Sequence, residues 1–555
     1  MTPVSRSLLL AGLTLLVSVR LGAQAATPRD SIVATRHTLV LNGKPIRYTA
    51  RAGLLPLYVN DTGELMARMF FVSYTADAAV GEPRRPLTFV WNGGPGSSSS
   101  QVHLVGFGPR RVRTANTYPE WARGGQTTLG DNQESWLGVS DLVFVDPVGT
   151  GYSRATSTEA RDILYTERGD IEAVAEFIRL YRTRFDAFDA PLFLAGESYG
   201  TTRAMGVADA LERRRTRVSG VVLISGFFEA GQRVPESLNA ALQLPQFTVA
   251  AHFHRKLPAE LQALTRDEAA ARATQWARAT YAPALARRDS LSAEDRAAVI
   301  AGVARFTGLS APDVNTRTLT VSKPDFTDKL VKDRGLELGR YDSRMTASSR
   351  GERPWMPMLD PSLLAMIDIM QGSSPLLIRY IRDTLQYRSD LLYRGPFGEA
   401  FHPEPLTLNP AGIGSDWMAM MWNRGRLAGG GRGGAPGEGS VPPAGAGQPS
   451  ANQPATPQAA STPPTPPTPL TPLTPPPLKR AMETNARLRV LNMKGMFDGS
   501  CAALEEAVTR TDDALRSRIT TRCYAGGHMM YSDLEVRRQL QRDFTEFVRS
   551  AIERR

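Results

Sequence analysis

Residues 191–200 read Pro-Leu-Phe-Leu-Ala-Gly-Glu-Ser-Tyr-Gly, which places a serine between two glycines at the end of an apolar run. The apolar part is typical of a buried strand, and the residues after Gly200 favour a helix. Both glycines permit a sharp turn from strand to helix, and such a turn lifts the Ser198 hydroxyl clear of the backbone. The stretch therefore predicts an exposed serine nucleophile on a strand–turn–helix unit.

The segments around this turn alternate between strand-like and helix-like patterns. Three further apolar runs are typical of buried strands: residues 87–91, 141–145 and 220–224. Helical spacing over 167–185 predicts a helix, and alternation over 37–75 predicts an antiparallel meander. Strands that alternate with helices predict a mostly parallel central sheet with helices on both faces. Combined with the serine turn, this pattern predicts the α/β-hydrolase fold.

The rest of the chain predicts an insertion and a linker within one fold. Residues 26–228 would form the first part of the core, and residues 229–423 have mainly helical spacing, which favours a cap inserted over the active edge of the sheet. Residues 424–478 are rich in Gly, Pro and Thr and cannot bury a core, so a disordered linker is expected. Residues 479–555 then predict the last strands and helices of the same core.

The N-terminus and the charge bear on location and partners. Residues 1–25 resemble a secretory signal peptide, with an uncleaved apolar helix as the alternative. We expect a secreted or periplasmic protein with no stable membrane insertion once the signal is removed. The net charge is +11, but the arginines are scattered and do not interleave with aromatic residues, so no nucleic-acid partner is expected. The oligomeric state stays open.

A serine nucleophile needs a base and an orienting acid, which follow it along the chain in this fold. Among the six histidines, His528 follows a strand-like segment near the C-terminus. Asp498 follows the preceding strand-like segment and would hold the imidazole tautomer. The sequence therefore predicts a triad of Ser198, Asp498 and His528.

The sequence offers no set of metal ligands, and no cofactor is expected. His252 and His254 lack a nearby third ligand, which favours a surface pair on a helix. Cys501 and Cys523 lack metal-ligand spacing, and in an exported protein they suggest a disulfide that would pin the two triad loops together, with two free thiols as the alternative.

An anion site next to the serine needs two backbone N–H groups. Tyr199, directly after Ser198, supplies the first. The loop over residues 91–99, Trp-Asn-Gly-Gly-Pro-Gly-Ser-Ser-Ser, follows a strand and suits the second. Because this loop lacks the lysine and the spacing of a phosphate-binding loop, a serine hydrolase is the better interpretation.

Four motifs together resemble the serine carboxypeptidases and occur in that family's order: residues 91–99, 146–153, 196–200 and 526–529. The similarity extends from about residue 60 to the C-terminus, is weak in the helical insertion, and points to an exported, bacterial-type member. It implies release of C-terminal residues from peptides with a free C-terminus through an acyl-enzyme. It also implies that Gly94 and Tyr199 donate to the oxyanion, and that Asn92 and Glu197 bind the substrate's terminal carboxylate.

Glu197 gives this resemblance a physical test. Two carboxylates at hydrogen-bond distance cannot both be ionised cheaply, so a protonated Glu197 would donate to the substrate, and free-acid peptides should bind better at acidic pH. A buried hydrogen bond to the turn is the structural alternative. The position of the family's second acid is occupied here by Gly106, so the acid pair is incomplete. The position of one family cysteine is occupied by Ser97, so the disulfide formed by that cysteine in the family is absent.

Two other functions remain open from the sequence. The same machinery also serves esterases and acyltransferases, which a comparison of free and amidated peptides would separate. A non-catalytic binding protein on this fold is the third reading, which covalent labelling of Ser198 would exclude.

Overall fold

The computed structural model describes residues 32–78, 81–114, 127–348, 360–364, 374–395 and 475–553. The signal-like residues 1–25 and residues 424–474 of the expected linker lie outside these described residues.

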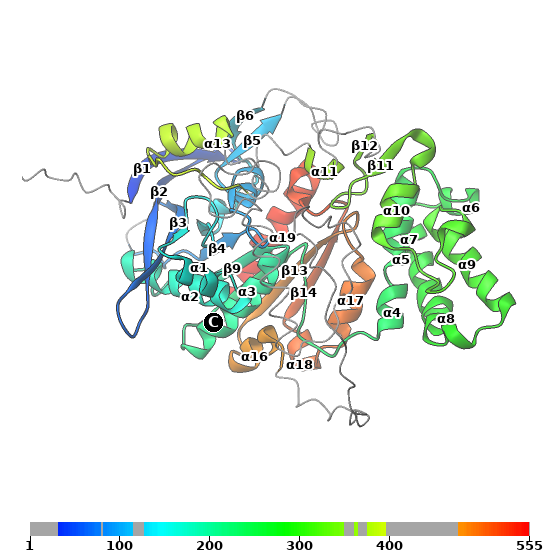
Figure 1. The fold of residues 1–555 in the computed structure, drawn as a ribbon. Helices are drawn as coiled ribbons and strands as arrows, with labels where there is room; N and C mark the ends of the chain where they lie inside the picture. Colours follow the sequence, from blue (N-terminus) through cyan, green and yellow to red (C-terminus); the bar gives the residue numbers. More distant parts are fainter. Residues whose placement is uncertain are drawn as a thin grey trace, which may run out of the picture.

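A ten-stranded sheet runs through the molecule (Figure 1). Its spatial order is β1 (Val33–Leu41), β2 (Lys44–Tyr58), β3 (Leu65–Ala76), β7 (Asp141–Val145), β4 (Leu87–Trp91), β9 (Leu192–Glu197), β10 (Gly220–Ile224), β13 (Arg489–Gly495) and β14 (Ile519–Tyr524), with β8 (Arg154–Ala155) paired to β3. All neighbours from β7 to β14 are parallel, whereas β1, β2, β3 and β7 pair antiparallel. The predicted meander and mostly parallel centre are therefore both confirmed.

Strand β9 shows how the two faces of the sheet are filled. Leu192 and Leu194 belong to one apolar cluster, whereas Phe193 and Ala195 belong to another. Successive side chains of a strand point to opposite faces, so a continuous apolar run such as this one needs cover on both sides. The sheet is accordingly the middle of three layers.

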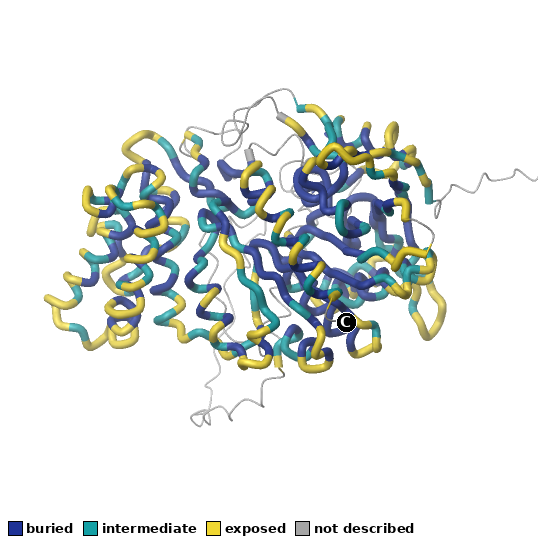
Figure 2. Tube along the Cα trace, turned by 180° about the vertical axis from the view of Figure 1, so that it is seen from behind, coloured by how far each residue is buried: buried dark blue, intermediate teal, exposed yellow. Residues whose placement is uncertain are grey.

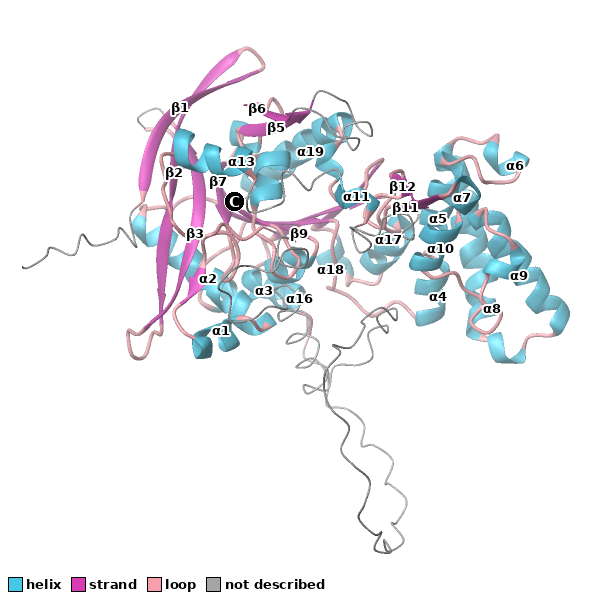
Figure 3. Cartoon of the chain, turned by 45° about the horizontal axis from the view of Figure 1, so that its top comes forward, coloured by secondary structure: helices cyan, strands magenta, loops and turns pink. Residues whose placement is uncertain are grey.

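Helices supply the two outer layers, and Figure 3 shows α3 and α19 on opposite sides of the sheet. One face is covered by α1 (Thr158–Leu164), α2 (Glu167–Arg184), α3 (Tyr199–Arg213), α16 (Pro477–Thr484) and α18 (Asp513–Arg516). The other is covered by the π-helix η1 (Val102–Phe107), α13 (Pro375–Arg379), the π-helix η9 (Tyr380–Thr384) and α19 (Leu534–Glu553). This arrangement is the α/β-hydrolase fold expected from the sequence.

A mainly helical cap lies beyond β14, at the opposite end of the sheet from the meander (Figure 1). It consists of α4 (Glu236–Ala241), α5 (Leu244–Phe253), α6 (Ala259–Gln262), α7 (Arg266–Trp276), α8 (Ala282–Ala286), α9 (Ala293–Thr307) and α10 (Lys323–Lys329). These helices share an apolar cluster of their own, and their outward faces are exposed in Figure 2. The cap packs on the core partly through Ala502 of α17 (Cys501–Thr509).

Smaller elements complete the described part of the chain. They are the hairpins β5 (Arg110–Thr114) with β6 (Thr127–Asp131) and β11 (Leu336–Leu338) with β12 (Thr346–Ser348), and the short helix α11 (Pro361–Leu364). Residues 374–395, within the expected insertion, pack on the sheet and not on the cap, since Leu377, Tyr380 and Tyr393 lie in the cluster that also contains α19.

The expected surface pair at His252 and His254 is wrong for the second residue. His254 caps the end of α5 and is 7% exposed, because the loop that follows β11 covers it and the Ser343 carbonyl lies 2.6 Å from its Nε2. Within the described ranges, no helix is both long and apolar enough to cross a membrane.

Candidate active site

Ser198 lies at the turn between β9 and α3, as the sequence predicts. Its backbone has φ 59° and ψ −127°, a conformation that non-glycine residues rarely adopt. A Cβ at Gly196 would collide with the Gly200 carbonyl, and a Cβ at Gly200 would lie 2.9 Å from the Asn92 oxygen. Both flanking positions therefore require glycine, and the strained turn presents the serine at the carboxyl edge of the sheet.

Asp498 and His528 meet at the same edge. They follow β13 and β14, which are parallel neighbours, so their loops emerge side by side. The His528 Nδ1 lies 2.9 Å from Asp498 Oδ2 and donates to it, because an ionised carboxylate can only accept. The loop after β10 links this pair to the serine turn: Ser225 Oγ donates to the His528 carbonyl at 2.6 Å, and Ser198 N donates to Ile224 O at 2.9 Å.

The electrostatic surroundings of Asp498 keep it ionised. Burial would raise its pKa, but the charge and hydrogen bond of His528, followed by Lys323 and Lys494, hold that pKa well below its ordinary value. Lys323 Nζ lies 2.5 Å from the Asp498 carbonyl and 3.5 Å from Oδ1, and Lys494 Nζ lies 3.8 Å from Oδ2. Asp498 can therefore act as a permanent anion beside the imidazole.

Glu197 and Asn92 also come together. Asn92 Nδ2 donates to Glu197 Oε2, and the Tyr531 hydroxyl lies 3.0 Å from each Glu197 oxygen. Glu197 is 2% exposed, and this burial raises its pKa to about 7, although His528, Tyr531 and Asn92 favour the anion. The acid beside the serine is therefore half-protonated near neutral pH.

The glycine-rich loop after β4 packs directly on the serine turn. A Cβ at Gly93 would lie 2.5 Å from the Tyr199 nitrogen, and Gly94 has φ +99°. The loop is held by Arg203 of α3, whose Nη1 donates to the Asn92 carbonyl at 2.7 Å and whose Nε donates to Asp170 at 2.7 Å. The backbone groups of Gly94 and Tyr199 are thus carried by two segments in close contact.

Comparison with known proteins finds a family match over part of the chain. Residues 47–237 match the serine carboxypeptidase family. This segment is similar to the serine carboxypeptidases. The matched segment contains the loop after β4 and the serine turn, so the resemblance drawn from the motifs is confirmed.

Curated relatives match over part of the chain. The pheromone-processing carboxypeptidase kex1 of Aspergillus clavatus is 31% identical over 173 residues, which cover 28% of this chain and 25% of the relative. The protein of the same description from Schizosaccharomyces japonicus is 27% identical over 209 residues, 37% of either chain. The chain thus spans about a quarter of the first of these relatives.

Solved structures resemble the chain over a greater length. The prohormone-processing carboxypeptidase Kex1 of Saccharomyces cerevisiae aligns with 90% of this chain and 91% of its own at a TM-score of 0.49 and 14% identity.

Several residues around this site are not predicted by the sequence. Lys494 lies four residues before Asp498 on the same segment, so its proximity could have been inferred from the sequence. Tyr531, Arg203 and Lys323 carried no comparable signal, because each reaches the site through tertiary packing. In the part of the chain that is described, no group of three or more His, Cys, Asp or Glu residues could hold a metal ion.

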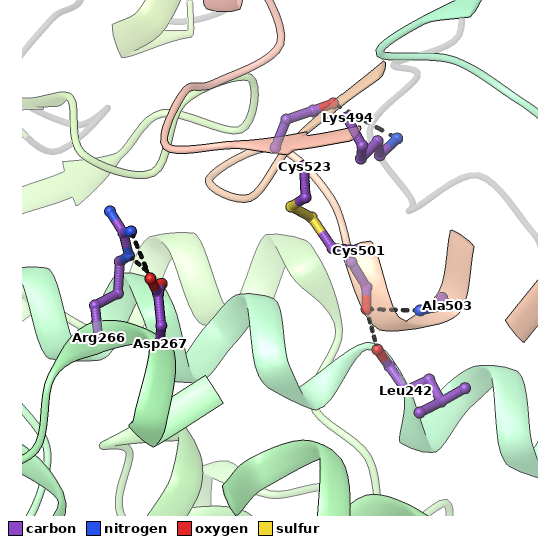
Figure 4. The surroundings of a disulfide bond; sticks show 9 residues. Leu242, Arg266, Asp267, Lys494, Cys501, Ala503 and Cys523 are labelled. Atoms are coloured by element: carbon purple, nitrogen blue, oxygen red, sulfur yellow. Dashed lines mark hydrogen bonds and ion pairs between the residues drawn. A yellow bond between two sulfur atoms is a disulfide. The ribbon is translucent and has the colours of Figure 1, made fainter. Parts of the chain in front are cut away.

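Cys501 and Cys523 form a disulfide between the start of α17 and β14 (Figure 4). Their Cα atoms are 6.0 Å apart, and they are separated by 22 residues. Cys501 follows Asp498 by three residues and Cys523 precedes His528 by five, so the bridge ties together the two segments that carry the pair.

Removing this bridge should destabilise the protein. A Cys501→Ala/Cys523→Ala variant is expected to lose about 3 kcal/mol of unfolding free energy, because the unfolded chain regains the freedom of the closed loop. Urea unfolding measures the loss, and the wild type under reductant should match the variant. A change below about 0.5 kcal/mol would show that the bridge has no structural role.

Proposed function

We propose that the protein is an exported serine-type carboxypeptidase, which removes residues from the C-terminus of peptides through an acyl-enzyme on Ser198. The strained turn, the Asp498–His528 pair and the adjoining glycine-rich loop support the chemistry. The signal-like pattern of residues 1–25 supports export to the periplasm or the medium. Peptides with a free C-terminus would be the substrates.

The reaction follows from the roles of three side chains. His528 Nε2 accepts the proton of the Ser198 hydroxyl as Oγ attacks the carbonyl carbon of the last peptide bond. Asp498 holds the Nδ1–H and stabilises the imidazolium that forms. The imidazolium then gives its proton to the leaving amino group, and water, activated in the same way, releases the shortened peptide from the serine ester.

The oxyanion of each tetrahedral intermediate needs preorganised donors. Gly94 and Tyr199 would supply them from their backbone N–H groups. The close approach of Gly93 to the Tyr199 nitrogen supports this role, because it brings the two segments to one point.

The observation that carries the carboxypeptidase assignment is the buried acid next to the nucleophile. A neutral Glu197 donates a hydrogen bond to a substrate carboxylate, and Asn92 supplies a second donor. An amidated or esterified C-terminus would lose the charge that these groups recognise. An enzyme without specificity for chain ends would have no use for a costly buried acid at this point.

Matched peptides with free and amidated C-termini test the proposal. Below about pH 7 Glu197 is neutral and binds the free acid, whereas above that pH the Glu197 and substrate carboxylates repel each other. Above about pH 7, kcat/KM on the free-acid peptide should therefore fall about tenfold per pH unit relative to kcat/KM on the amide. Glu197→Gln keeps the shape and should remove this fall. Glu294→Gln, on an exposed turn of the cap, is the matched control.

The outcomes separate the competing functions. Equal cleavage of the free and amidated peptides at every pH would contradict carboxypeptidase action and favour an esterase or acyltransferase. Failure of a fluorophosphonate to label Ser198 would instead favour a non-catalytic binding protein.

A further inference from the structure

The Tyr531 hydroxyl lies within hydrogen-bond distance of both oxygens of Glu197, and no pattern in the sequence predicts this contact. It lies in the short 3-10 helix η10 (Met530–Ser532), three residues after His528. Its hydroxyl is 3.0 Å from Oε1 and 3.0 Å from Oε2. Burial raises the pKa of Tyr531 well above its ordinary value, so the phenol stays protonated and donates a hydrogen bond to the carboxyl group.

The ring of Tyr531 is held rigidly. The residue is 0% exposed, and its ring packs edge-on against Phe107 of η1 at 5.2 Å between centroids. Its carbonyl accepts from Nη1 of the buried Arg537 at 2.8 Å, and Arg537 is itself paired with Glu134 at 3.1 Å. The hydroxyl is therefore preorganised toward Glu197.

Gly106 explains why this ring fits. A Cβ at Gly106 would already lie 3.4 Å from two Tyr531 ring carbons, so a larger side chain would compete with the ring for the space. The expected acid pair is thus replaced here by one carboxyl group and one phenol. A carboxyl pair shares protons and titrates in two coupled steps, whereas a carboxyl group beside a phenol titrates once near neutral pH.

We propose that Tyr531 is a positioning residue of the carboxylate subsite: by donating to both oxygens of Glu197, it sets the pH range over which a free C-terminal carboxylate is bound. This inference rests on the proposed function. The other ionisable groups that influence Glu197 are His528, which favours the anion, and Asp498, which opposes it. Asn92 is the other side chain that donates a hydrogen bond to Glu197. Tyr531 supplies a neutral hydroxyl, which holds the acid in place from the side of η1.

Tyr531→Phe tests the inference, because it removes the hydroxyl and keeps the ring. The Glu197 anion loses a donor, so its pKa rises, and the pH midpoint of the free-acid to amide ratio of kcat/KM should move up by about one unit. The ratio cancels any pH dependence of the catalytic steps that both peptides share. Tyr281→Phe is the control, since Tyr281 is a buried cap residue that donates to the Leu319 carbonyl at 2.6 Å.

The Glu197→Gln background makes the test specific. There, Tyr531→Phe should leave the ratio independent of pH. An unchanged midpoint in the single variant would overturn the inference, and so would a shift that persists without Glu197. A purely structural role would lower kcat/KM on both peptides and leave the midpoint in place.

A second measurement keeps this test independent of the substrate. The pKa of Glu197 is higher in the folded state than its ordinary value of 4.5, so the stability it contributes at low pH is lost as the pH rises from 4.5 through about 7. In Tyr531→Phe this loss of unfolding free energy should extend to higher pH. Urea unfolding measures it, with Glu197→Gln as the reference that lacks the titrating group. If the wild type cleaves free-acid and amidated peptides equally but the stability loss extends to higher pH in Tyr531→Phe, the proposed function is wrong and the Tyr531–Glu197 coupling is supported. If the stability loss keeps its pH range in Tyr531→Phe, the coupling is wrong.

Discussion

Replacing Ser198 by alanine is expected to lower kcat on a free-acid peptide by about 10⁵–10⁶-fold. The serine supplies the bond-forming atom, and without it the base and the acid have nothing to activate, so losses of this size are typical of such sites. Alanine keeps the Cβ and therefore the same demand on the backbone at φ 59°. The loss should appear in kcat while the protein stays folded.

The measurement pairs single-turnover kinetics with fluorophosphonate labelling. Ser517→Ala, at an exposed position that follows α18, is the matched control and should retain wild-type rates. A Ser198→Ala enzyme that keeps more than about one hundredth of its kcat would show that the nucleophile lies elsewhere.

Much of the core could be predicted because its signals are local. Strands β4, β7 and β10 have the expected bounds, since each is a short, mainly apolar run that is almost wholly buried. The serine turn was equally accessible, because Gly196, Ser198 and Gly200 form a local pattern directly after a strand-like apolar run. The position of His528 beside Asp498 followed from chain order, since consecutive parallel strands bring their carboxyl ends to one edge.

Contacts between distant segments could not be predicted in this way. Tyr531 reaches Glu197 because η10 packs against η1, about 430 residues earlier in the chain, and no local pattern encodes that contact. The same limit applies to Lys323, which approaches Asp498 from the cap. Helical spacing also does not say which surface an apolar face covers, so the sequence predicts residues 374–395 to be part of the cap although they pack on the sheet.

Replacing Asp498 by asparagine is expected to lower kcat by about 10⁴-fold with little change in KM. The carboxylate accepts the His528 Nδ1–H at 2.9 Å, so Nε2 is left free to accept the serine proton. An amide that turns its N–H toward Nδ1 would reverse the tautomer and place a proton on Nε2. The imidazolium would also lose the charge that stabilises it.

Stability and mechanism can be separated in this variant. Lys323 keeps its contact with the Asp498 carbonyl, but Lys323 and Lys494 lose a buried counter-charge, so some loss of unfolding free energy should accompany the loss of kcat. Asp513→Asn, on the exposed side of α18, controls for the charge change. A kcat loss below tenfold would mean that another group orients the His528 ring. The Tyr341 carbonyl does not do so, because it accepts from the His528 backbone N–H at 2.6 Å and fixes only the main chain.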